Sequence, residues 1–113
     1  MRTLKSAKAF ERVFKKGRRG RSPFVRVSVL ACEGSEQPSV AFVAPKRLGN
    51  AVYRNRCKRV LREAARASGL PLLGYDVILF ATDRTHDASP EELLRGLRTA
   101  IAKAGVGALR GDE

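Results

Sequence analysis

The sequence predicts a small α/β protein with a single domain, in which one sheet is covered by helices. The chain has 113 residues and a mass of 12.4 kDa, which is enough for one core of two layers but not for a second domain. Hydrophobic residues make up 43% of the chain, and they recur with a helical period in some segments and with a period of two in others. These observations exclude a multi-domain enzyme and a disordered chain.

The first element is predicted to be a helix over residues 6–16. Ser6 is a suitable N-cap and Gly17 a suitable residue after the last turn. Between them, the apolar side chains fall on one arc of the helix, with Phe10 and Phe14 at one edge of that arc. The residues that follow, Arg18, Arg19 and Arg21 with Gly17 and Gly20, predict a flexible basic loop that contacts phosphates, or else a solvated turn.

Two strands are predicted next. Residues 24–31 alternate with a period of two, with Val27 on the valine side and Arg26 on the other. Residues 33–38 have the composition of a turn, and the mostly apolar residues 39–44 follow. This order predicts an antiparallel hairpin between 24–31 and 39–44.

A loop over residues 45–49 then leads into a long helix over residues 50–68. Asn50 can cap its first turn, and Gly69 and Pro71 end it. Residues 75–81 form a third clear strand, for which Asp76 is a candidate cap of the preceding turn.

The last helix is predicted over residues 89–104. Ser89 and Glu92 form a capping box with proline at the first helical position. Helices 50–68 and 89–104 are expected to pack against the sheet, with helix 6–16 along one edge. Only the tail, residues 105–113, is expected to be loosely ordered.

The charge of the chain is concentrated in its first part. Residues 1–66 hold 18 Lys and Arg against 4 Asp and Glu, whereas residues 67–113 hold 5 against 7. Such an excess indicates a polyanionic partner, with nucleic acid before an anionic membrane. No apolar run approaches the roughly 18 residues of a membrane span, and Cys32 and Cys57 lack the spacing of a zinc site or a disulfide scaffold. A reduced, cytoplasmic protein without a membrane partner is therefore expected.

One side of helix 50–68 is basic. Arg54, Lys58 and Arg62 form a row of like charges at a spacing of four residues, which costs helix stability. Arg54 and Arg56 also lie near the positive end of the helix dipole. This arrangement favours a face that binds a polyanion over an ordinary solvated face.

The segment that contains this helix resembles a known family. Residues 44–63, which read Ala-Pro-Lys-Arg-Leu-Gly-Asn-Ala-Val-Tyr-Arg-Asn-Arg-Cys-Lys-Arg-Val-Leu-Arg-Glu, resemble the signature of the bacterial ribonuclease P protein subunit. Phe10-Glu-Arg-Val-Phe14 resembles the aromatic pair of the family's first helix, and the resemblance extends over nearly the whole chain except its acidic end.

The resemblance implies a fold and a function. The fold is a small two-layer sandwich of the ribosomal protein S5 domain 2-like type, with a mixed sheet of three to four strands, three helices and a left-handed βαβ crossover, where the general rule gives a right-handed one. The function is that of a protein cofactor of the ribozyme ribonuclease P, which removes the 5′ leader of precursor tRNA. Catalysis would belong to the RNA and its Mg²⁺ ions. One protein per RNA is expected, and the protein alone is not expected to be catalytic.

The resemblance also assigns residues to two surfaces. The residues expected to face the catalytic RNA are Lys46, Arg47, Arg54, Asn55, Arg56, Lys58, Arg59 and Arg62. The residues expected to line a cleft for the leader are Phe10, Phe14, Arg18, Arg19, Arg26 and Val27. Two positions depart from the family pattern, since Val27 stands where relatives commonly have an aromatic residue and Pro45 where they have a small polar one.

Other interpretations stay open at this point. Phe10 and Phe14 could belong to the core instead of a cleft, and a ribosomal-type RNA-binding protein would share the charge. Asp83, His86 and Asp87 could suggest a metal site or a self-sufficient nuclease, although the loop has one histidine and an adjacent arginine. No metal ligands are predicted on the protein itself.

Overall fold

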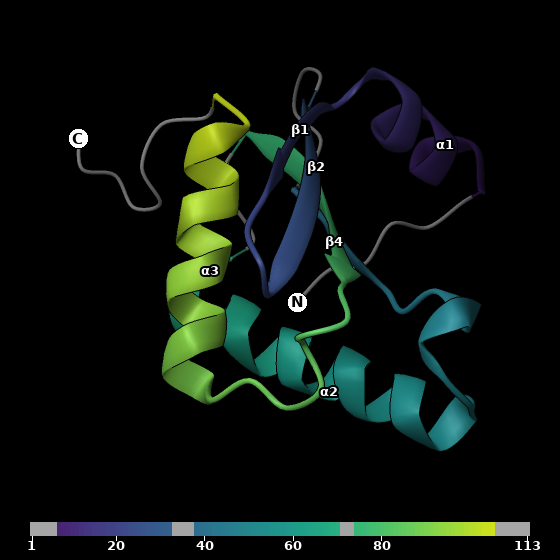
Figure 1. The fold of residues 1–113 in the computed structure, drawn as a ribbon. Helices are drawn as coiled ribbons and strands as arrows, with labels where there is room; N and C mark the ends of the chain where they lie inside the picture. The colour runs from purple at the N-terminus through teal and green to yellow at the C-terminus, as the bar shows by residue number, and fades with distance from the viewer. Residues whose placement is uncertain (1–6, 33–37, 71–73, 106–113) are drawn as a thin grey trace.

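The computed structural model describes residues 7–32, 38–70 and 74–105, which form one four-stranded sheet with helices on both faces (Figure 1). The elements, in chain order, are α1 (Ala7–Lys16), β1 (Arg18–Arg21), β2 (Val25–Ala31), β3 (Val40–Val43), the 3-10 turn η1 (Lys46–Leu48), α2 (Ala51–Ser68), β4 (Tyr75–Ala81) and α3 (Pro90–Lys103). The α/β class, the three helices and the mixed sheet are as predicted.

The strand order is β1-β2-β4-β3, so the predicted hairpin between residues 24–31 and 39–44 is wrong. β4 lies between the two strands, antiparallel to β2 and parallel to β3. The apolar sequence of β4 explains this order, because a strand between two others has both faces covered. Val77, Ile78 and Leu79 of β4 are all fully buried in this position. The parallel neighbours β3 and β4, joined through α2, form the predicted βαβ unit.

The predicted basic loop is a strand. β1 pairs antiparallel with β2, with Gly20 opposite Val27. The Arg-Arg-Gly-Arg sequence of β1 shows no apolar alternation because β1 packs against α3 through its glycine and not through apolar side chains. A Cβ on Gly20 would collide with the backbone of Ala100 in α3. Only glycine lets the helix approach the strand this closely.

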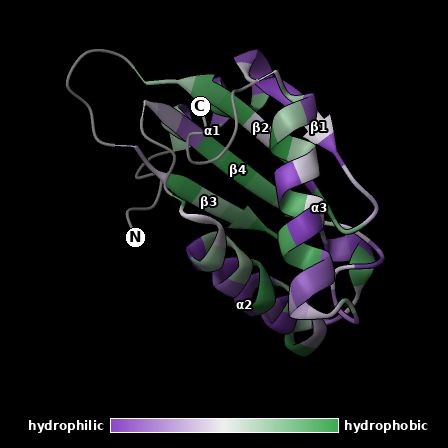
Figure 2. Ribbon diagram, turned by 90° about the vertical axis from the view of Figure 1, so that its left-hand side faces the viewer, coloured by the Kyte–Doolittle hydropathy of each residue, from purple (hydrophilic) through white to green (hydrophobic). Residues whose placement is uncertain are grey.

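The main core lies between the sheet and the two long helices. Val25, Val27 and Val29 of β2 face it, together with Leu61 of α2 and Leu97 of α3. Figure 2 shows the largely apolar strands β2, β3 and β4 beside α2 and α3, and both helices carry apolar and hydrophilic residues.

The first helix packs on the other face of the sheet. Figure 1 shows α1 and α3 on opposite sides of the strands. Val13 is the fully buried residue of α1, and its carbonyl accepts a hydrogen bond of 2.8 Å from the Ser28 hydroxyl of β2. The expectation that helix 6–16 lies along an edge is therefore corrected, since Ser28 and Phe80, which contact this helix, belong to the two central strands β2 and β4.

The ends of the long helices follow the predicted caps. Asn50 Oδ1 accepts from the backbone N–H of Tyr53 at 2.9 Å, and Gly69 ends α2 in the left-handed conformation with φ 94°. Ser89 and Glu92 form the reciprocal capping box of α3. The proposed cap Ser6, the helix-ending Pro71 and the tail after residue 105 lie outside the described residues.

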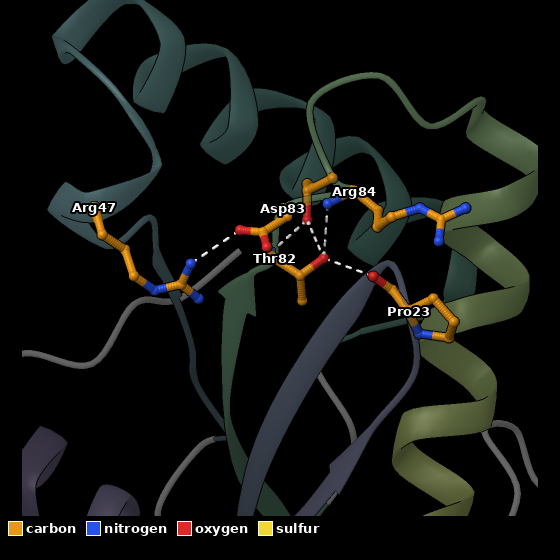
Figure 3. Close-up of polar contacts among 6 residues, drawn as sticks. Pro23, Arg47, Thr82, Asp83 and Arg84 are labelled. Carbon is orange, nitrogen blue, oxygen red and sulfur yellow. Dashed lines mark hydrogen bonds and ion pairs between the residues drawn. The ribbon is translucent and has the colours of Figure 1, made fainter.

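The loop between β4 and α3 is tied to two other parts of the chain. The Thr82 hydroxyl donates to the carbonyl of Pro23 at 2.6 Å, and the Asp83 carboxylate accepts from Arg47 Nη1 at 2.9 Å (Figure 3). The Thr85 hydroxyl adds a 2.7 Å bond to the carbonyl of Phe24. The loop is thus fixed both to the β1–β2 turn and to η1, just ahead of the basic helix.

At the other end of β4, a buried carboxylate holds the sheet together. Asp76 is 5% exposed and accepts hydrogen bonds from the backbone and hydroxyl of Ser39, at 3.0 and 2.8 Å, and from Cys32 Sγ at 3.3 Å. The residue expected to cap a turn therefore joins the start of β3 to the end of β2.

Candidate nucleic-acid interface

A groove opens on the face of the sheet that carries α1. Its volume is about 350 Å³. The residues that line it come from α1, β1, β2 and β4, and are Phe14, Arg19, Gly20, Arg21, Arg26, Val27 and Phe80.

Two aromatic rings line this groove, those of Phe14 and Phe80, and the Phe10 ring lies against Phe14 outside it. The Phe10 and Phe14 rings are nearly parallel, at 11°, with centroids 6.3 Å apart. Phe14 contacts Phe80 of β4 at 5.9 Å and 57°. Because Phe14 is 38% exposed, the pair on α1 is not simply core. Phe80 was missed by the sequence analysis, although the period of two in residues 75–81 already places it on the face opposite Val77.

Arginines stand over these rings. The Arg19 guanidinium lies 4.8 Å from the Phe14 centroid, and its Nη2 donates to the Phe14 carbonyl at 2.7 Å. The Arg26 guanidinium lies 6.0 Å from the Phe80 centroid. Aromatic faces with adjacent cations are the combination that binds single-stranded nucleic acid, since bases stack and phosphates are neutralised.

Phe10 is not among the residues that line the groove and borders a separate hollow beside α1. Two further expected residues do not offer side chains to the groove. Val27 is 2% exposed and belongs to the core beneath α3, so it cannot present a face to a base. Arg18 lies on the α3 side of β1, where its guanidinium approaches Gly105. The alternation of a strand explains both placements, because neighbouring residues point to opposite faces.

The second surface is the basic side of α2 with η1. Lys46, Arg47, Asn55, Arg56, Arg59 and Arg62 are exposed, and Arg54 and Lys58 are partly exposed. Within the described part of the chain, Arg47 is the only cation of this set with an acidic partner, Asp83 at 2.9 Å. The positive charge of the helix is therefore left for an external anion.

Several of these side chains are oriented by neighbours. Arg54 Nε donates to the carbonyl of Gly49 at 3.1 Å, Arg56 Nε lies 3.4 Å from the carbonyl of His86, and the Arg62 guanidinium lies 5.3 Å from the Phe42 centroid. These contacts use part of each guanidinium and leave its other N–H groups for phosphate oxygens.

The loop residues that could suggest a metal site are engaged with one another and with this helix. The His86 ring stacks on Tyr53 at 4.0 Å and 6°, and its Nδ1 lies 2.7 Å from Asp87. No group of three His, Cys, Asp or Glu side chains gathers anywhere in residues 7–32, 38–70 and 74–105. Partial burial raises the pKa of Tyr53, with smaller contributions from Cys57, Asp87 and Asp83.

The two surfaces differ in composition. The groove beside α1 is lined by aromatic and cationic side chains, whereas the side of α2 described above carries mainly cationic ones. None of the helices among the described residues is long and apolar enough to cross a membrane. A family model described as Ribonuclease P matches residues 1–105.

The chain belongs to the ribonuclease P protein family. The ribonuclease P protein component of Gluconacetobacter diazotrophicus is 38% identical over 112 residues, which cover 97% of this chain and 94% of that protein. The corresponding protein of Thermus aquaticus is 36% identical over 104 residues, and the match spans 92% of this chain and 60% of the longer Thermus protein.

Solved structures of the family have the same fold. The Staphylococcus aureus RNase P protein superposes with a TM-score of 0.77 at 25% identity, covering 94% of this chain and 97% of that one. A variant of the S. aureus protein, described as having defective mRNA degradation activity, gives 0.77 at 26% identity over 92% of this chain and 88% of that one.

Proposed function

We propose that this protein is the RNA-binding subunit of ribonuclease P, the ribozyme that matures the 5′ end of tRNA. Membership of the family supports a role as a subunit in tRNA processing and a partnership with the ribonuclease P RNA. The observation that carries the finer proposal is the presence of two separate surfaces, one on each side of the sheet, which suit two different kinds of RNA.

The basic side of α2 and η1 binds the catalytic RNA. A folded RNA presents closely spaced phosphates, and a row of unpaired cations at a spacing of one helical turn matches them. Side-chain amides such as Asn55 add hydrogen bonds to phosphates and sugars.

The aromatic groove binds the 5′ leader of precursor tRNA. The leader is single-stranded, so its bases are free to stack on Phe14 and Phe80, while Arg19 and Arg26 neutralise its backbone. Mature tRNA has no leader and gains nothing from this groove.

Endonucleolytic cleavage belongs to the RNA and its Mg²⁺ ions. The described residues provide no set of carboxylates that fits Mg²⁺, because Asp83 is paired with Arg47 and Asp87 with His86. We place the metal on the RNA, in a cytoplasmic complex of one protein and one RNA.

Two other functions are weighed against this one. A ribosomal-type protein would share the charge but would not need an open aromatic groove. A protein nuclease would act on RNA by itself, and the description of the S. aureus variant makes this worth testing directly. Purified protein, freed of RNA, should leave both precursor tRNA and mRNA intact at every Mg²⁺ concentration.

Co-purification tests the proposal. The tagged protein is isolated from its cells in mild salt and the bound RNA is sequenced, with the variant Arg56→Glu/Lys58→Glu as a matched control. One abundant structured RNA of several hundred nucleotides, depleted in the control, is the expected result. A full set of ribosomal RNA would refute the proposal.

A further inference from the structure

A second recess lies between α2 and the start of α3, away from the aromatic groove. Its volume is about 360 Å³. The residues that line it are Arg56, Arg59, Val60, Glu63, Ala64, Ala67, Ala88, Pro90 and Leu93.

Small side chains create this space. Ala64 and Ala67 occupy successive turns of α2 where it faces Pro90 and Leu93 of α3. Larger side chains at these positions would fill the gap between the helices. The partly exposed Val60 and Ala88, with the exposed Ala67 and Pro90, give the recess an apolar floor.

The rim of the recess carries charge of both signs. Arg56 and Arg59 lie at one end and Glu63 one turn further along α2. In the described residues, none of these three side chains has an ion pair of 4.0 Å or less, although several arginines surround Glu63 in the sequence. Glu63 is the one acidic residue on a helix otherwise charged positively.

We propose that this recess binds a single unpaired guanine of the RNA that lies on the basic helix. The apolar floor accepts the face of the base, and Arg56 and Arg59 contact the phosphates on either side of it. Guanine presents two adjacent donors, N1–H and the N2 amino group, which the two oxygens of the Glu63 carboxylate can accept together. Adenine and cytosine offer one such donor on that edge, and uracil offers its imide N–H alone.

The proposal rests on the proposed function for the source of the base, since RNA bound to α2 would bring the guanine to this place. An acidic peptide would satisfy the arginines but would be repelled by Glu63. The recess therefore gives the basic surface, which otherwise contacts only phosphates and sugars, one position that distinguishes between bases.

The experiment uses the full chain and short oligonucleotides. Methyl resonances of Leu93, Val60 and Ala67 are followed by NMR during titration with the trinucleotides UGU, UAU and UCU, and with UIU, in which inosine lacks the N2 amino group. Resonances of Phe14 and Phe80 report binding to the aromatic groove in the same samples.

UGU should shift the recess methyls at concentrations about tenfold lower than UAU or UCU, which is the discrimination expected of a bidentate contact. UIU should fall between them. Glu63→Gln should remove the preference for guanine, and Ala67→Leu, at an exposed position, should abolish the shifts by filling the recess.

Equal affinities for UGU and UAU at the recess, or shifts confined to Phe14 and Phe80, would overturn the proposal. These outcomes do not depend on the catalytic RNA. A preference for guanine at the recess together with failure to co-purify a ribozyme would instead contradict the proposed function alone.

Discussion

Replacing Phe14 with alanine separates a binding role of this ring from a packing role. Phe14 is 38% exposed. Replacing a fully buried phenylalanine with alanine costs about 3 to 5 kcal/mol, so the buried part of Phe14 corresponds to a loss of about 2 to 3 kcal/mol of folding stability. If a leader base stacks on the ring, affinity for precursor tRNA falls by a further, separate amount of about 1 to 3 kcal/mol.

Val13→Ala is the matched control. Val13 is fully buried one position earlier in α1, and removing two buried methyl groups costs about 2 to 3 kcal/mol with the cavity included. The two variants should therefore melt at similar temperatures, while only Phe14→Ala changes the groove.

The assay measures the affinity of the reconstituted holoenzyme for precursor tRNA and for mature tRNA, below the melting temperature of both variants. Phe14→Ala should weaken binding of precursor tRNA by about 5- to 150-fold and leave mature tRNA unchanged. Phe80→Ala should act in the same direction. Equal losses for both RNAs, or an equal leader-specific loss in Val13→Ala, would refute the stacking role.

Three further outcomes are expected. A plot of the logarithm of the association constant for the catalytic RNA against the logarithm of the salt concentration should have a slope on the order of −5. Arg56→Glu/Lys58→Glu should make that slope shallower by about 2. An unchanged slope would show that these two cations contact no phosphate. Burial raises the pKa of the Cys57 thiol and the pKa of Tyr53, so the unfolded chain releases these protons at a lower pH than the folded protein does. The free energy of unfolding, measured in denaturant, should therefore be constant below about pH 8.5 and decline above it. Cys57→Ala should reduce this decline. Sulfate should raise the melting temperature more than chloride at equal ionic strength, because specific binding adds about 2.7 kcal/mol to the free energy of unfolding at 100 times its Kd. Identical melting curves in the two salts would leave only screening.

The helices were predictable from sequence because their signals are local. Asn50, Gly69 and the Ser89–Glu92 capping box lie within a few residues of the backbone groups that they satisfy. The strand order was not predictable in the same way. The composition of residues 33–38 predicts a turn between residues 24–31 and 39–44, and no local signal indicates that the more apolar residues 75–81 separate the two strands.

The residues of the candidate site also divide into those that a local sequence pattern predicts and those that depend on the tertiary fold. The basic side of α2 follows from one helix and its period, so its residues could be named from the sequence. The groove combines side chains of four elements, and Phe80 enters it only because β4 pairs with β2 and places Phe80 opposite Arg26. β1 was missed because its packing is made by the glycine backbone, which no hydrophobic pattern records.

The central position of β4 also sets the order in which the protein can fold as it is synthesised. Val77 is the register partner of both Val29 and Val40, so β2 and β3 have no common neighbour until residues 75–81 have left the ribosome. The 18 Lys and Arg of residues 1–66 precede that strand. A chain that stops short of β4 would thus be an unfolded polycation that binds RNA without selection.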